Sequence, residues 1–257
     1  MSEHVRVDRV RGVLAITLAR PERRNAITVA MYEALAKAIE GAAEDPSVRL
    51  ITIRGEGPDF AAGNDLADFA QAMPRDLTEV PVWRLLRALT ACTVPLVAAV
   101  HGNAVGIGTT MLLHCDLVIA AERTRFSLPF VDLALVPEAA SSLLLPRLAG
   151  RRRAARYLLL GEPFGAEEAL AIGVASHVVP DDELEEALGS VVESLLAKPA
   201  DALAITQQLL RHGNQDELIE RMELESRHFT ERLRSAEVGE AITAFFEKRK
   251  PDFDRLR

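Results

Sequence analysis

Three closely spaced glycines mark the segment of this chain that is best suited to chemistry. Gly102, Gly106 and Gly108 follow a short apolar run and precede Met111, within HGNAVGIGTTMLLHCD at 101–116. Glycine permits sharp turns and lets a ligand approach the backbone closely. The apolar residues that follow predict a buried helix, whose first N–H groups lack partners inside the helix. The pattern predicts a backbone site for an anion or oxyanion, although a tightly packed strand-to-helix turn explains the glycines equally well.

A second glycine-containing segment, FAAGNDL at 60–66, lies about forty residues upstream. It follows an apolar run at 48–53 that is typical of a strand. In this order and at this spacing, the two segments resemble the paired motifs of the crotonase superfamily, the enoyl-CoA hydratase/isomerase proteins. Three further segments extend the resemblance over nearly the whole chain: RPERRNA at 20–26, LVPEAASS at 135–142 and FEKRKPDF at 246–253.

The resemblance implies an oxyanion hole made by the backbone. In the family, two N–H groups grip the thioester carbonyl of an acyl-CoA, and the motifs match them to Asn64 and Ile107. Two donors are needed because the proton α to a thioester is weakly acidic, and an enolate forms only where its charge meets preorganised donors. The neighbouring Asp65 is expected to cap a helix rather than to react.

The general base is where this chain departs from the best-known pattern of the family. The positions of the two hydratase glutamates hold Thr110 and Phe130, neither of which can act as a carboxylate base. Glu138 matches the position where isomerase-type members carry their acid. The residue types alone favour another reading, because Pro137 and Glu138 make a good helix start. Asp132 and Asp68 are alternative carboxylates that match no catalytic position.

The resemblance therefore implies an enzyme that moves a double bond from C3 to C2 of an enoyl-CoA. One carboxylate suffices, because a dienolate spreads charge over C2 and C4, so the same group can remove one proton and return it at the other carbon. Two alternatives stay open within enzymes, a hydratase and an isomerase of a ring or epoxide acyl-CoA. A third belongs to another class, a binding protein that keeps the acyl-CoA site without turnover.

Recognition of coenzyme A is expected near the segments at 20–26 and 60–66. Arginines could attract its phosphates, and backbone positions could line the adenine pocket. Coenzyme A is expected only as part of the substrate, with no separate cofactor. The residues matched to this role are Arg23, Arg24, Ala26, Ala62 and Leu66, with Lys248 and Lys250 as weaker candidates that could reach a neighbouring subunit's ligand.

Composition is compatible with this interpretation and excludes other classes. The chain has 257 residues, of which 49% are hydrophobic and 26% charged, as in ordinary globular proteins. Its formal net charge of −8 argues against binding to nucleic acid or to acidic membranes, and no apolar run is long enough to span a bilayer. Cys92 and Cys115 form neither a disulfide framework nor a metal motif. We expect a cytoplasmic protein.

The elements that must position these residues alternate along the chain. Runs at 5–10 and 13–18 predict a hairpin, and Asn25 or Thr28 could cap a helix that extends to about Ala43. Strands at 48–53, 96–100 and 117–120 then alternate with helices, which predicts parallel βαβ units. The other predicted elements are helices over Asp65–Ala72 and Val82–Leu89, helices starting near Glu138 and Arg151, and a strand over Ala175–Val179.

The C-terminal part is predicted to be helical from Asp182 onward. Apolar stripes at helical spacing include Leu184 and Leu188, and later Leu218, Met222 and Phe229. We expect an α/β fold with two regions, residues 1–197 as the core with the acyl-CoA site and 198–257 as a helical region. The resemblance implies a crotonase-like spiral of ββα units whose helical region supports a homotrimer or a dimer of trimers.

Overall fold

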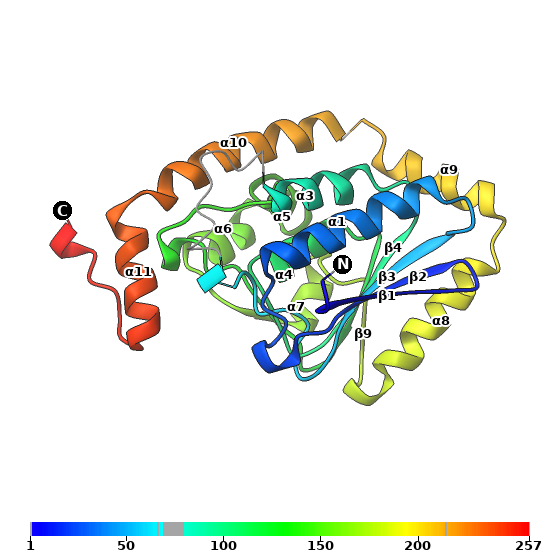
Figure 1. Cartoon of the computed structure of the whole chain (residues 1–257), viewed down its shortest axis with the longest axis horizontal. Helices are drawn as coiled ribbons and strands as arrows, with labels where there is room; N and C mark the ends of the chain where they lie inside the picture. The colour runs from blue at the N-terminus through cyan, green and yellow to red at the C-terminus, as the bar shows by residue number, and fades with distance from the viewer. Residues whose placement is uncertain (1, 66, 69–79, 214, 257) are drawn as a thin grey trace.

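The computed structural model describes residues 2–65, 67–68, 80–213 and 215–256 and contains two β-sheets surrounded by helices (Figure 1). The larger sheet has six strands in the order β1-β2-β3-β4-β6-β9. The β1-β2 pair is antiparallel and every later pair is parallel, as the predicted hairpin and βαβ units require. The strands are β1 (Val5–Val10), β2 (Val13–Leu18), β3 (Leu50–Gly55), β4 (Leu96–Val100), β6 (Leu117–Ala121) and β9 (His177–Val179).

Both faces of this sheet are buried at its centre, as β4 shows, whereas the edge strand β1 is mostly exposed. Side chains alternate across a strand, so Ala98 and Val100 join the main core while Val97 and Ala99 face the opposite side. The helices α1 (Val29–Glu44) and α3 (Pro81–Ala91) contribute to the main core, and α8 (Leu184–Leu196) covers the other face. This double burial explains why β4 reads as a continuous apolar run.

The smaller sheet lies where the glycine-rich segment leaves the main sheet. It has the order β5-β7-β8, formed by β5 (Asn103–Val105), β7 (Arg125–Ser127) and β8 (Phe164–Gly165). Phe126 and Phe164 stack across it with ring centroids 5.3 Å apart. The strand β5 leads directly into α4 (Ile107–Thr110) and the 3₁₀ turn η3 (Met111–His114), so this sheet fixes the start of the glycine turn.

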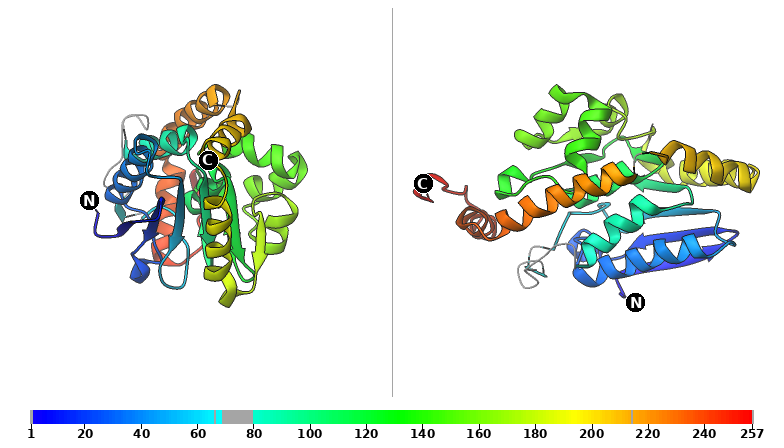
Figure 2. Two further views of the ribbon diagram at one scale, coloured as in Figure 1. Left: turned by 90° about the vertical axis from the view of Figure 1, so that its right-hand side faces the viewer. Right: turned by 90° about the horizontal axis from the view of Figure 1, so that it is seen from above.

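The C-terminal helices pack onto the α/β core. In the view from above in Figure 2, α10 (Gln215–Leu233, orange) lies between α3 on one side and the green helices α5 (Ser141–Ala149) and α6 (Arg151–Leu159) on the other. The predicted stripe of α10 faces inward, since Met222 and Phe229 are buried in the main core. The remaining elements are η1 (Pro21–Arg23), η4 (Val131–Leu133), α7 (Ala166–Ala171), η5 (Asp181–Glu183), α9 (Ala200–Arg211), α11 (Ala236–Glu247) and η6 (Asp254–Leu256).

Several predicted boundaries differ in detail. Of the two predicted caps of α1, Thr28 is the one that caps it, by accepting the Met31 N–H. Asn25 is buried, accepts the Arg20 N–H and donates to the carbonyls of Glu56 and Asp59. The strand predicted at 48–53 runs from Leu50 to Gly55. The helix predicted over Asp65–Ala72 lies largely outside the described residues.

The helix predicted to start near Glu138 begins three residues later, at Ser141. Ala139 and Ala140 intervene with φ values of 60° and 56°, so the backbone at these two residues cannot be α-helical. Glu138 therefore precedes the helix and does not belong to its first turn. The division into regions 1–197 and 198–257 stays a prediction. Within the described part of the chain, no helix is long and apolar enough to cross a membrane.

Candidate active site

The two motifs with glycines lie against each other. The Val105 N–H donates to the Ala61 carbonyl at 2.9 Å, and the Ala61 N–H donates to the Asn103 carbonyl at 3.1 Å. Gly108 sits so close to this pair that a Cβ atom would come within 2.8 Å of the Ala61 carbonyl oxygen. The glycine is therefore required for the close approach of the two segments.

The backbone N–H of Asn64 is directed away from the neighbouring strand-like segment. The Ile27 N–H donates to the Gly63 carbonyl at 2.8 Å, and the Asp65 N–H donates to the Ile27 carbonyl at 3.0 Å. In parallel pairing, a residue flanked by two such bonds points its own N–H to the opposite side. The Asn64 N–H is therefore left free of this pairing, and Asn64 lines a cleft.

The second candidate donor, the Ile107 N–H, begins α4. Gly106 precedes it with φ 53° and ψ −118°, a conformation open almost only to glycine. The Gly106 carbonyl accepts from Thr109 and Thr110, and the first N–H groups of the helix have no intrahelical acceptor. Ile107 lines the same cleft as Asn64, so the structure brings the two predicted donors to one surface.

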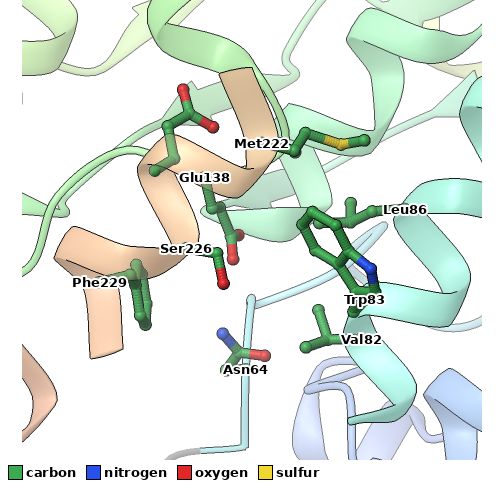
Figure 3. Close-up of a pocket in the computed structure, with 10 residues that line it drawn as sticks. Asn64, Val82, Trp83, Leu86, Glu138, Met222, Ser226 and Phe229 are labelled. Carbon is green, nitrogen blue, oxygen red and sulfur yellow. The ribbon is translucent and has the colours of Figure 1, made fainter. Parts of the chain in front are cut away.

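This cleft has a volume of about 570 Å³ and contains the predicted base. Glu138, Asn64 and Phe130 line this cleft. Glu138 and Asn64, but not Phe130, also line a second, smaller chamber of about 30 Å³. The chamber is walled by apolar side chains of α3 and α10, and the polar side chains of Asn64, Glu138 and Ser226 also face it (Figure 3). Its other lining residues are Val82, Trp83, Leu86, Ala139, Met222, Glu225, Ser226 and Phe229.

Glu138 is held in surroundings that favour its protonated form. Burial raises its pKa to about 8, and the charge of Glu225 acts in the same direction. Its Oε1 is enclosed without a hydrogen-bond partner among the described residues. Thr110 lies close enough to Glu138 to lower this pKa. The Thr110 hydroxyl nevertheless makes no hydrogen bond within the described part of the chain.

Thr110 and Phe130, at the positions of the hydratase glutamates, are both buried at the site. Phe130 lines the cleft, so an aromatic ring stands at one of these two positions. Of the alternative carboxylates, Asp68 accepts the Val29 N–H at 2.7 Å and thereby supports the start of α1. Asp132 lines the cleft but is exposed.

Sequence reasoning missed two polar groups at the site. Tyr32, buried on α1, donates its hydroxyl to the Asn64 side-chain oxygen and so fixes the residue that carries one candidate donor. Burial raises the pKa of Tyr32, and the charge of Glu138 raises it further. Glu225 on α10 is the second. The sequence does mark Glu225, because this charged residue lies at helical spacing within the apolar stripe that contains Met222 and Phe229.

The residues predicted to bind coenzyme A divide into two groups. Arg23, Ala26 and Ala62 line the cleft, whereas Leu66 lies outside the described residues. Arg24 is absent from the lining that the described residues form, and its Nε lies 3.7 Å from an Asp59 oxygen.

The C-terminal part of the cleft wall is formed by α11 and the residues after it. Phe245 and Phe246 line it, as does Arg249, which is bound by Glu240 at 2.5 Å. The predicted Lys248 and Lys250 are exposed beside this wall. Within the described residues, no group of three or more His, Cys, Asp or Glu side chains is placed to hold a metal ion.

Asp65 has the structural role that its type predicted. Its Oδ1 accepts the N–H groups of Ala67 and Asp68, both at 3.1 Å, and its Oδ2 pairs with Arg20 at 2.7 Å. Hydrogen bonds from these groups lower the pKa of Asp65 and oppose the effect of its burial. Asp65 thus anchors the end of the FAAGNDL segment.

Comparisons with known proteins give the family. The family model described as enoyl-CoA hydratase/isomerase matches residues 8–255. The chain is 37% identical over 257 residues to the 2,3-dehydroadipyl-CoA hydratase of Escherichia coli (strain K12), covering 98% of this chain and 99% of that protein. It is 34% identical over 249 residues to the 1,2-epoxyphenylacetyl-CoA isomerase of the same organism, covering 95% of each.

Solved structures agree with this result. The structure of Pseudomonas aeruginosa OdaA matches with a TM-score of 0.92 and 40% sequence identity, over 95% of this chain and 99% of that one. The mixed α/β architecture and the helical C-terminal region described above are those of this structural family. The chain belongs to the enoyl-CoA hydratase/isomerase family, the crotonase superfamily.

Proposed function

We propose that this enzyme moves the double bond of a 3-enoyl-CoA to C2, with Glu138 as the only acid–base group. The observation that carries the proposal is the buried carboxyl of Glu138, with its pKa raised to about 8, on the wall of the cleft that Asn64 and Ile107 also line. Thr110 and Phe130 stand where a hydratase would need carboxylates.

In this mechanism the thioester oxygen accepts hydrogen bonds from the N–H groups of Asn64 and Ile107. Glu138, as the carboxylate, removes a proton from C2, and the resulting dienolate is stabilised at its oxygen by the two donors. The protonated Glu138 then returns the proton at C4, which leaves the double bond between C2 and C3. A base with a pKa of about 8 suits both steps, since it accepts and donates a proton readily near neutral pH.

The surroundings of Glu225 argue against hydration as the main reaction. A hydratase needs a second carboxylate that can activate water, and Glu225 shares the chamber wall with Glu138. Its two oxygens already accept the N–H groups of Ala140, at 2.7 Å, and Ser142, at 2.9 Å. Both oxygens of Glu225 thus serve the protein backbone.

Isomerisation of a ring or epoxide acyl-CoA is the second candidate. It is favoured by the similarity to an epoxyphenylacetyl-CoA isomerase and by the two aromatic side chains of the chamber, Trp83 and Phe229. The position of Glu138 on the cleft wall supports either enzyme over a binding protein without turnover, which would need no buried, unpaired carboxyl oxygen there.

A substrate panel tests these proposals. Purified protein is assayed for isomerisation of 3-enoyl-CoA, hydration of 2-enoyl-CoA and rearrangement of an aryl epoxide acyl-CoA. We expect isomerisation to have the highest kcat/KM and to be lost in Glu138→Gln. Faster hydration than isomerisation would refute the single-carboxylate proposal, and binding without turnover of any substrate would favour a binding protein.

A further inference from the structure

The turn that carries Glu138 is held in an unfavourable conformation. Ala139 and Ala140 both have positive φ values, of 60° and 56°, although neither is a glycine. Left-handed backbone at a residue with a Cβ persists only where surrounding contacts hold it. The helix α5 that follows has Ala140 as its N-cap, which supplies no side-chain hydrogen bond. Both the turn and the helix start therefore depend on other parts of the chain.

Two side chains from other elements supply this support. His114, at the end of η3, has its Nε2 atom 2.8 Å from the Ala139 carbonyl, and since a carbonyl only accepts, Nε2 carries the proton. Burial lowers the pKa of His114 to about 4, so the ring is neutral at physiological pH. Glu225 on α10 accepts the N–H groups of Ala140 at 2.7 Å and Ser142 at 2.9 Å.

Glu225 is itself buried, with 5% of its surface exposed, and lines the chamber beside Glu138. Burial raises the pKa of Glu225, but hydrogen bonds from Ser142 and Ala140 and the charge of Arg221 oppose that effect. The pKa of Glu225 is raised on balance, and the N–H donors to both of its oxygens are what favours its charged form against burial. Glu138, whose Oε1 has no donor among the described residues, is the carboxyl of this pair that holds the proton.

We propose that Glu225 is the positioning residue of the base: it holds the strained turn that carries Glu138 and places a second negative charge beside that side chain. The proposal rests on the proposed function only in making Glu138 the base. Glu225 acts through Glu138 and is not assigned contact with the substrate.

The charge of Glu225 has a defined consequence for Glu138. After burial, it is the second cause that raises the pKa of Glu138. Among the described residues, the other groups that act on Glu138 or are acted on by it are Thr110 from α4 and the neutral phenol of Tyr32 from α1, while Arg221 of α10 acts on Glu225. Removal of the charge at residue 225 should therefore allow Glu138 to lose its proton at lower pH.

The test compares Glu225→Gln, Glu225→Asp and the matched control Glu223→Gln, an exposed glutamate on the same helix. The dependence of kcat and KM on pH is measured for isomerisation. In Glu225→Gln the rising limb of kcat/KM should move to lower pH by on the order of one unit. Glu225→Asp keeps the charge but is too short for both N–H groups, so kcat should fall about 10- to 100-fold while KM changes little. The control should match the wild type.

A direct titration separates this inference from the proposed function. Protein with ¹³C-labelled glutamate carboxyls is titrated by NMR, and Glu138 is assigned by the signal lost in Glu138→Gln. A lower midpoint for Glu138 in Glu225→Gln supports the proposal even if another reaction replaces isomerisation. An unchanged midpoint in folded Glu225→Gln would overturn it. If Glu225→Gln does not fold, Glu225→Asp decides, because an undiminished kcat in that variant would equally overturn the positioning role.

Discussion

Replacing Glu138 with glutamine should stabilise the protein, and by an amount that grows with pH. The folded chain holds the Glu138 proton to a pKa of about 8, compared with an ordinary value of 4.5. Because the folded state binds this proton more tightly, its contribution to stability is fully present below pH 4.5 and is lost as the pH rises towards 8. Glutamine never ionises, so the variant escapes this loss.

The size of the effect follows from the same pKa values. Each pKa unit corresponds to about 1.4 kcal/mol, so a rise of about 3.5 units sets an upper limit of about 5 kcal/mol. Part of the Glu138 side chain is accessible from the cleft, so water lowers the cost of its charge below this limit. At pH 5 the variant and the wild type should differ by about 1 kcal/mol or less.

The assay is urea unfolding of both proteins between pH 5 and pH 9 at one protein concentration. Fluorescence of Trp83, the single tryptophan, reports on the chamber that contains Glu138. Taking the difference between the two proteins at each pH cancels the titration of the groups that do not interact with Glu138. A difference that stays constant from pH 5 to pH 9 would refute the elevated pKa of Glu138 and its burial as the cause.

Three further predictions follow from other parts of the structure. Gly108→Ala should lower kcat by about 100-fold or more, because the added Cβ would push Ala61 away from the Ile107 turn. The control Gly41→Ala, where a Cβ meets nothing within 4 Å, should leave kcat unchanged. Equal activity of the two variants would contradict this geometry. Trp83→Ala should enlarge the chamber and shift the kcat/KM optimum to longer acyl chains, whereas an unchanged optimum would mean that the acyl group binds elsewhere. Leu209 and its neighbours on α9 are exposed apolar residues that a partner subunit could cover, so light scattering should show an assembly, a trimer or hexamer as the family resemblance implies. A stable monomer at micromolar concentration would contradict this.

The strands of the large sheet and most helices could be predicted because each leaves a local signal, whereas the short strands β5, β7 and β8 of the smaller sheet were not predicted. The hairpin of β1 and β2 and the apolar run of β4 follow from alternation and burial on both faces. The start of α5 could not be predicted, since Pro137 and Glu138 fit a helix start locally. The chain instead takes positive φ at Ala139 and Ala140, where His114 and Glu225 from distant segments hold it.

The candidate site shows the same division between local and distant information. Asn64, Ile107 and Glu138 were found from motif spacing, and all three line one cleft. Tyr32 gave no local signal, because its importance arises from a contact with Asn64, which lies 32 residues away in the chain. Glu225 did give one, a charge inside an apolar stripe, but only packing shows that the charge faces Glu138.

The role of Glu138 as the base for double-bond migration is tested most directly by comparing Glu138→Gln with Thr110→Ala. Isomerisation of a 3-enoyl-CoA is measured alongside binding of a saturated acyl-CoA. Glu138→Gln should retain binding, since the Asn64 and Ile107 donors remain, and should lose roughly 10²- to 10⁴-fold in kcat. Thr110→Ala should keep its maximal rate at high pH, because the hydroxyl only lowers the pKa of Glu138. Activity that survives in Glu138→Gln and vanishes in Thr110→Ala would contradict the single-carboxylate mechanism.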